Sequence, residues 1–156
     1  MPIDDPEWLT GASERIRVMY AYWRAKCRGE SPPRRADIDP IELPPDFLPH
    51  ITIVEAVPDE RRYVYRLVGT MEVEIRGSDP TGKSVIEAFF GPSVDDALGC
   101  YDAVVSTRLP YYDREPFSLA EGNFSDDEDL FLPLSDDGRT INRVLVFGAV
   151  SSKLPA

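Results

Sequence analysis

Cysteine is scarce in this sequence, which contains two among its 156 residues, Cys27 and Cys100. They are far apart and form no Cys-x-x-Cys pair. Their number and spacing argue against the disulfide framework of small secreted domains and against a thiol-ligated metal site. Both fall in segments with helical spacing, so we expect two reduced, half-buried thiols in a cytoplasmic protein.

Histidine is rarer still, because His50 is the single example in the chain. A Ser-His-Asp triad could be built only around this residue. His50 lies between Pro49 and Ile51 at the start of a predicted strand, with no nucleophile-elbow motif nearby. The sequence therefore predicts an ordinary residue at a strand edge rather than a catalytic base.

Basic residues are few, with 17 Lys and Arg against 28 Asp and Glu, and the formal net charge is −11. Nucleic-acid phosphates would repel such a protein, and an anionic membrane surface would find no polybasic patch. The sequence also lacks a long apolar run and a basic-then-apolar signal segment. We expect a cytoplasmic protein with neither nucleic acid nor membrane as a partner.

One motif suggests an enzyme: residues 77–84 read Gly-Ser-Asp-Pro-Thr-Gly-Lys-Ser, the pattern of a phosphate-binding P-loop. A working P-loop follows a buried parallel strand and offers consecutive backbone N–H groups. Here Pro80 removes one N–H, Asp79 adds a negative charge, and residues 71–76 carry three charges. A P-loop-like nucleotide-binding enzyme is therefore a remote alternative, and a short helix is predicted to start near Ser84.

The chain has enough apolar material for one domain, since 42% of its residues are hydrophobic and 10% aromatic. An amphipathic helix is predicted over Pro6–Arg28, within a flanking region at residues 5–29. Its apolar residues recur every three or four positions on one face, where two Trp require burial against a large surface. A Pro-rich strap at residues 30–48 follows, with a helical turn near Pro40–Leu48. The helix's apolar residues are Trp8, Ala12, Ile16, Met19, Trp23 and Cys27.

The remaining core, residues 49–151, alternates between predicted strands and helices. An acidic run at residues 125–129 is predicted to be a solvated loop, and residues 135–138 a hairpin turn. The last strand is apolar without alternation, so it must be covered on both faces. We therefore predict an α+β fold, in which a five-stranded antiparallel sheet carries inserted short helices and the N-terminal amphipathic helix packs on the sheet. The predicted strands are 51–57, 62–70, 109–120, 128–134 and 142–151, and the predicted helices are 71–75, 85–90 and 94–107, the last capped by Ser93.

Four segments carry a resemblance: PPRRADIDP (32–40), YRLVGT (65–70), GSDPTGK (77–83) and LPLSDDG (132–138). Together they resemble a bacterial family of compact, single-domain PAS-like proteins. The resemblance runs from about Asp5 to Val150, and it implies one domain over residues 1–156 whose sheet cups short helices, without established catalytic residues. Flavin-adduct PAS domains share an Asn-Cys-Arg-Phe run that Cys100 does not match, and haem-binding ones use a helix histidine unlike His50. The cofactor is left unknown.

Arg66 is the most notable candidate site residue. Strand alternation places it in an apolar strand, on one face with Val64 and Val68. A buried Arg requires an anionic partner, either a carboxylate of this chain, which we favour, or an acidic ligand. Aromatic residues could fill the predicted cup or line a pocket in it. The candidate ligand pocket is Arg66, Tyr65, Phe89, Tyr101 and Tyr111, and the candidate interface is Trp8, Ile16, Met19 and Trp23.

The leading hypothesis is a non-enzymatic PAS-type sensory or signalling module that binds a small molecule in the cup or a protein partner. We expect its output in trans, because the sequence contains no kinase, cyclase or DNA-binding element. The alternative is a structural protein-interaction adaptor with a cup filled by its own side chains. A homodimer is expected through the N-terminal helix. A void of several hundred Å³ in the cup would favour the ligand, and a packed cup the adaptor.

Overall fold

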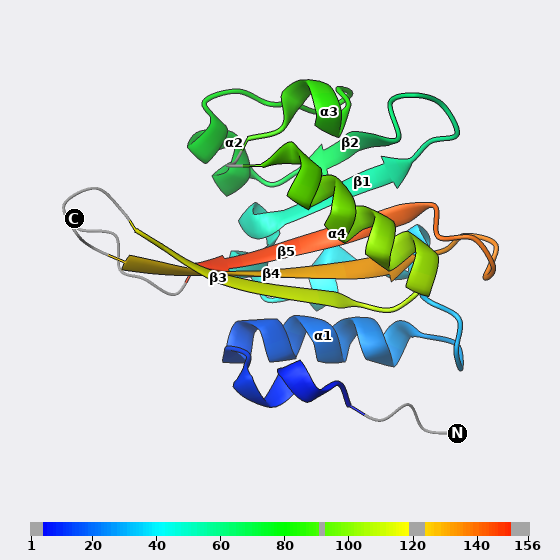
Figure 1. Ribbon diagram of the computed structural model, residues 1–156. Helices are drawn as coiled ribbons and strands as arrows, with labels where there is room; N and C mark the ends of the chain where they lie inside the picture. The colour runs from blue at the N-terminus through cyan, green and yellow to red at the C-terminus, as the bar shows by residue number, and fades with distance from the viewer. Residues whose placement is uncertain (1–4, 91–92, 119–123, 151–156) are drawn as a thin grey trace.

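The computed structural model describes residues 5–90, 93–118 and 124–150, arranged as Figure 1 shows. Its five-stranded sheet has the order β2-β1-β5-β4-β3, and each neighbouring pair is antiparallel. The predicted α+β fold is confirmed. The strands are β1 (Ile51–Ala56), β2 (Tyr63–Val68), β3 (Tyr111–Ser118), β4 (Phe124–Leu134) and β5 (Arg143–Val150).

Helices cover both faces of this sheet (Figure 1). On one face α2 (Thr70–Arg76), α3 (Val85–Ala88) and α4 (Val94–Thr107) form the cup, and on the other lies α1 (Glu14–Lys26). Two buried clusters result, one on each side of the sheet. The last strand serves both, since Val144 belongs to the cup and Leu145 to the α1 side. The predicted two-sided cover of this strand is therefore confirmed.

The N-terminal region consists of two helices rather than the predicted continuous one. A 3₁₀ helix at Glu7–Gly11 is followed by extended backbone at Ala12, and α1 begins after Ser13. The Ser13 side chain accepts a hydrogen bond from Ile16 N at 3.4 Å. The prediction of one helix over Pro6–Arg28 is wrong because glycine weakens a helix at this point and serine caps a new one.

Both tryptophans nevertheless pack against the sheet, as predicted. Trp23 is buried, and its Nε1 donates a hydrogen bond to Pro133 O of β4 at 2.9 Å. Trp8 stacks on Tyr112 of β3, with ring centroids 4.9 Å apart. The two side chains thus attach the 3₁₀ helix and α1 to different strands of the same face.

Residues 30–48 form an ordered strap on the α1 side of the sheet. Its apolar side chains Ile38, Leu43 and Phe47 are buried in the same cluster as α1. Glu42 binds the strap to α1 through an ion pair with Lys26 Nζ at 2.9 Å. The predicted helical turn near Pro40–Leu48 is present in 3₁₀ form. The 3₁₀ segments are Arg35–Asp37, Pro40–Glu42 and Pro45–His50.

The strand β2 contains a bulge that the predicted alternation did not include. Ile53 of β1 pairs with Leu67, whereas the next residue, Val54, pairs with Tyr65. Arg66 is therefore an extra residue without a partner in the ladder. Such a residue reverses the side on which the following side chains point.

The bulge changes which residues share a face. Tyr65 and Val68 both contribute to the cup cluster, although strict alternation would separate them. Leu67, which strict alternation would place on one face with Tyr65, lies instead among residues of the α1 side. The predicted common face of Arg66, Val64 and Val68 is wrong for the same reason.

The acidic run at residues 125–129 lies inside β4 and not in the predicted loop. Across the β3–β4 pair, Glu128 is opposite Arg114 and Asp129 is opposite Asp113. Glu128 is only 1% exposed. The loop prediction is wrong because pairing with β3 extends the strand to Phe124. The Glu128 side chain then points into the protein.

The turn between β4 and β5 forms as predicted. The Asp137 side chain accepts hydrogen bonds from Arg139 N at 2.8 Å and Thr140 N at 2.7 Å, and Gly138 has a φ of 77°. These backbone hydrogen bonds lower the pKa of Asp137 to about 2. Local turn chemistry therefore shapes this connection. Arg108, at the end of α4, adds hydrogen bonds to Gly138 O and Arg139 O.

Candidate functional site

The cup is filled by aromatic side chains from both the sheet and α4. Tyr65 of β2 is 1% exposed, Tyr101 of α4 is 6% exposed and Phe131 of β4 is 7% exposed. The Tyr101 ring lies 5.0 Å from the Tyr63 ring and 5.5 Å from the Phe131 ring, measured between centroids. Such offset and edge contacts are the preferred arrangements of packed aromatic rings. These residues therefore form a core.

The structure brings some of the predicted pocket residues together. Tyr65 and Tyr101 lie in the cup, and Phe89 packs half-buried against the same cluster. Tyr111 stands at the rim, with its ring 6.0 Å from that of Phe131 and its side chain exposed. These four residues therefore lie in the interior and at the edge of the cup.

Arg66 is not part of that arrangement. Its position in the bulge leaves it exposed, and its Nε pairs with the Glu55 carboxylate of β1 at 2.9 Å. The prediction of a buried Arg66 is wrong, whereas the favoured partner, a carboxylate of this chain, is correct. No ligand is needed to explain this residue.

Arg76 is a basic residue that packs against the cup, and the sequence analysis did not single it out. Its guanidinium lies 4.8 Å from the centroid of the Tyr65 ring, a cation–π contact. Nη1 donates to Ala88 O at 3.1 Å and Nη2 to the Tyr65 hydroxyl at 3.3 Å. Nε is buried without a hydrogen-bond partner among the described atoms. The sequence did carry one signal for this residue. Arg76 follows Val73 by three positions, so both share a face of α2, and Gly77 ends the helix directly after it.

A polar depression of about 270 Å³ lies outside this arginine, between α2, α3 and the segment that connects them. Its lining includes Arg76, Ser78, Lys83 and Phe89. The connecting segment pairs with the free edge of β2, where Tyr65 N donates to Lys83 O at 3.0 Å and Gly82 N donates to Tyr65 O at 2.8 Å. It therefore closes an edge that would otherwise be open.

This geometry contradicts the P-loop alternative. Helix α2 precedes residues 77–84, the following α3 has four residues, and the sheet beside them is antiparallel. A P-loop requires a parallel strand before it and a helix long enough to present its N-terminus to phosphate. Asp79 instead accepts hydrogen bonds from Thr81 N and Oγ1 within the turn.

The two thiols and the histidine lie in ordinary surroundings. Burial raises the pKa of Cys27, and it raises the pKa of Cys100 to about 11, so both thiols are protonated at neutral pH. Burial lowers the pKa of His50. Within residues 5–90, 93–118 and 124–150, no three His, Cys, Asp or Glu side chains gather in a group that could hold a metal ion. No helix in those ranges could span a bilayer.

The predicted interface residues make their contacts within one chain. Ile16 and Met19 are fully buried between α1 and the sheet, as is most of Trp23. Trp8 is partly exposed beside Tyr112. While α1 stays docked, this set offers little surface to a second molecule.

Comparison with known proteins agrees with this architecture. A family model described as PAS domain matches residues 12–150. A sensory box sensor histidine kinase from Vibrio cholerae is 19% identical, with a TM-score of 0.52 over 67% of this chain and 82% of that one. No curated protein sequence matches the chain.

Two further structures are similar at lower scores. The LOV domain of a blue-light activated histidine kinase from Erythrobacter litoralis EL346 is 11% identical, with a TM-score of 0.45 over 66% of this chain and 95% of that one. The PAS domain of an HTR-like protein from Haloarcula marismortui is 16% identical, with a TM-score of 0.40 over 64% and 78%. The family match spans the sheet, α1 and the cup, as the resemblance implied, and the chain therefore belongs to the PAS domain family of sensory and signalling modules.

Proposed function

We propose that this PAS domain is a non-enzymatic sensory module that acts by binding a protein partner, and that its cup is a structural core rather than a ligand chamber. The packing of Tyr65, Tyr101 and Phe131 carries the proposal. Because side chains of this chain occupy the cup, a haem or flavin could enter only by displacing them.

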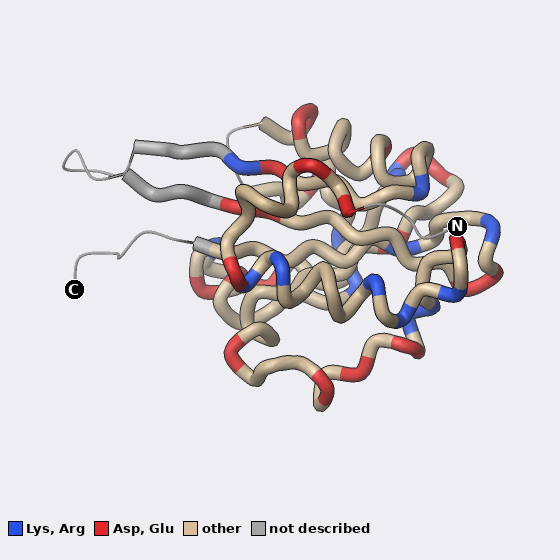
Figure 2. Tube along the Cα trace, turned by 90° about the horizontal axis from the view of Figure 1, so that it is seen from below, with Lys and Arg blue, Asp and Glu red and all other residues tan. Residues whose placement is uncertain are grey.

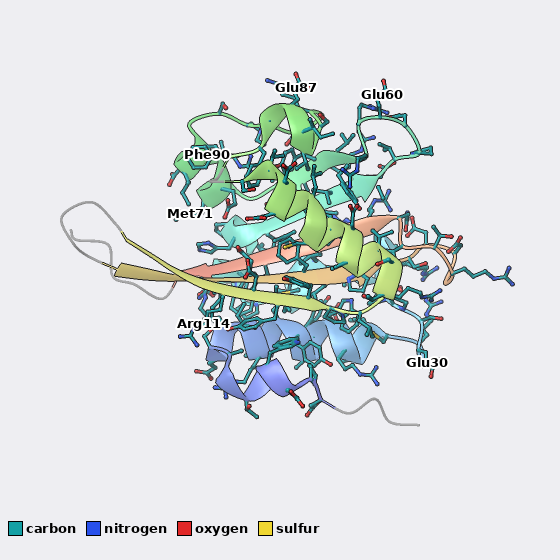
Figure 3. All side chains as sticks on the ribbon, in the orientation of Figure 1. Glu30, Glu60, Met71, Glu87, Phe90 and Arg114 are labelled. Carbon is teal, nitrogen blue, oxygen red and sulfur yellow. The ribbon has the colours of Figure 1, made fainter. Side chains whose placement is uncertain are left out.

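A surface for a partner is available on the outside of the cup. Four apolar side chains of α2, α3 and the residues after it are 37% to 54% exposed, and we call them the α2–α3 patch. Figure 3 labels two of them, Met71 and Phe90, at the same end of the molecule. Met71 and Ile75 lie four residues apart on one face of α2, and an exposed apolar face is typical of protein-binding surfaces. The α2–α3 patch comprises Met71, Ile75, Ile86 and Phe90.

Thermal shift on the purified protein tests the role of the cup. Haem, FMN and FAD should leave the melting temperature unchanged. Tyr101→Ala should lower stability by about 3–5 kcal/mol, the usual effect of truncating a large aromatic residue in a packed core. A saturable rise in the melting temperature of the wild type with any of the three cofactors would overturn the structural-core proposal.

Proximity labelling in the native cell tests the patch. Ile75→Glu places a charge on the α2–α3 patch, while Val18→Glu places the same charge on an exposed site of α1. Proteins labelled by the wild type should be lost with Ile75→Glu and retained with Val18→Glu. Equal labelling by both variants would show that the partner binds elsewhere.

A second copy of the chain is the other candidate partner. The homodimer expected through Trp8, Ile16, Met19 and Trp23 stays a prediction, as does the cytoplasmic location. A dimer that keeps α1 docked must use other residues, since this set is mostly buried. Sedimentation of the wild type and Ile75→Glu at micromolar concentrations distinguishes a dimer through the α2–α3 patch from a monomer.

A further inference from the structure

A groove of about 370 Å³ lies on the face of the sheet opposite the cup, between the strap and strands β1 and β2. Ile38, Leu43 and Leu48 line it from the strap, and Ile53 and Leu67 from the strands. Ile38, Leu43 and Ile53 are buried, whereas Leu48 is 39% and Leu67 is 42% exposed. The groove is therefore apolar and open to solvent along one side.

The walls of the groove are fixed in place by the backbone. Pro40, Pro45 and Pro49 restrict φ along the strap. At the end of β2, Gly69 N donates to Ile51 O at 2.8 Å, and a Cβ on Gly69 would lie 2.2 Å from Pro49 O. The residues that follow the strap and β2 thus touch backbone to backbone beside the groove. Its volume falls in the range of about 300–1,000 Å³ found for ligand pockets.

One charged side chain contributes to the lining of this apolar groove. Arg35 is the one charged residue among the described residues that line it. Nη1 donates to Ile38 O at 3.3 Å, and the side chain forms no ion pair with any described residue. Its neighbour Arg34, by contrast, pairs with Asp37 at 2.9 Å. A guanidinium without a carboxylate partner favours a ligand with its own anionic group.

We propose that this groove binds a free fatty acid, with the aliphatic chain along Leu43, Ile53 and Leu67 and the carboxylate paired with Arg35. The apolar walls match an unbranched chain, and the guanidinium matches a carboxylate in bidentate geometry. This inference goes beyond the proposed function and depends on the groove alone.

Calorimetric titration of the full chain with dodecanoate, below its micelle concentration, tests the proposal. We expect saturable binding at one site. Dodecan-1-ol keeps the chain but not the charge, and butyrate keeps the charge but not the chain. Both should bind at least tenfold more weakly than dodecanoate. Dodecyltrimethylammonium, with the opposite charge, should also bind at least tenfold more weakly.

Two substitutions assign the binding to these residues. Arg35→Gln should weaken dodecanoate binding roughly tenfold and leave dodecan-1-ol binding unchanged. Arg139→Gln makes the same charge change in the exposed β4–β5 turn and should change neither. Leu67→Gln, at an exposed position of the groove, should weaken both ligands, and Val18→Gln on α1 should weaken neither.

Several outcomes would overturn the proposal. Absence of saturable dodecanoate binding by the wild type is one, and unchanged binding by Arg35→Gln is another. Binding that survives Leu67→Gln but is lost in Tyr101→Ala would place the ligand in the cup. A dimer of the free protein that Leu67→Gln dissociates would show that a second copy occupies the groove. None of these results affects the partner test at the α2–α3 patch.

Discussion

Tyr112 of β3 donates a 2.6 Å hydrogen bond to Oε2 of Glu128 on β4, and Ser13 N donates to the same oxygen at 2.9 Å. Nearby, Arg114 Nη1 donates to Gly11 O at 3.0 Å, and Figure 3 shows this arginine extending from β3 toward the N-terminal helices. One buried carboxylate therefore joins two strands to the start of α1. Removing it should loosen the helix from the sheet.

The Glu128 carboxylate should make stability depend on acid pH. Burial by itself would raise its pKa, but the hydrogen bonds from Tyr112 and Ser13 outweigh burial and hold the pKa below the ordinary value. The resulting stabilisation is present above the unfolded-state pKa of about 4.3 and is lost as pH falls through the folded-state pKa. Glu128→Gln should lower stability at pH 7 by about 1–3 kcal/mol and flatten the acid decline.

Melting temperatures from pH 7 to pH 3 check this prediction. Glu74→Gln, an exposed change of the same charge, is the matched control. An acid decline in Glu128→Gln as steep as in the wild type would assign the effect to other carboxylates.

Replacing Trp23 by Phe should destabilise the docked α1. The substitution removes the Nε1 donor and leaves the buried Pro133 carbonyl without its side-chain partner. An unsatisfied buried carbonyl and a smaller ring together should lower the free energy of unfolding by about 2–4 kcal/mol. Urea unfolding measures the loss. Val18→Ala, exposed on the same helix, should change stability by no more than about 0.5 kcal/mol.

Two glycines should respond to alanine in opposite directions. A Cβ on Gly69 would lie 2.2 Å from Pro49 O, so Gly69→Ala requires backbone movement and should destabilise by about 3 kcal/mol or more. Gly99 lies inside α4 with open space around it, so Gly99→Ala should stabilise by about 0.5–1 kcal/mol. Thermal unfolding of the pair checks both. Equal effects would mean that the close approach at Gly69 relaxes freely.

Arg66 should matter little to stability despite its place in the centre of a strand. Its ion pair with Glu55 is substantially exposed, and such pairs contribute less than about 1 kcal/mol. Arg66→Gln, Glu55→Gln and the double variant form a double-mutant cycle. A coupling energy above about 2 kcal/mol would contradict this interpretation, and so would a strong loss of folding in either single variant.

Elements governed by local chemistry were predictable from the sequence. Helix α4 spans the predicted range behind its Ser93 cap, because a cap and helical periodicity act within a few residues. The turn around Gly138 follows from the same kind of local rule. The two-sided cover of β5 followed from its unbroken apolar run, which no exposed face could carry.

Features governed by pairing between distant segments were not predictable in this way. The bulge at Arg66 exists only in relation to β1, and the inward turn of Glu128 depends on β3 and on Ser13. From the sequence, Arg76 is an ordinary charged residue of a short helix, and its contact with the Tyr65 ring depends on how α2 packs on β2. The charge distribution did not point to a site either, because acidic and basic positions are interspersed over the face in Figure 2.

The extra residue in β2 has an evolutionary consequence. Any polar residue can occupy the position of Arg66, because it protrudes from the edge of the ladder. Deleting this residue would have a larger effect, because the side chains that follow it in β2 would point to the opposite face of the sheet. Leu67 would then enter the aromatic cup, and Tyr65 or Val68 would leave it. Natural relatives should therefore vary freely in identity at this point while their strand length stays constant.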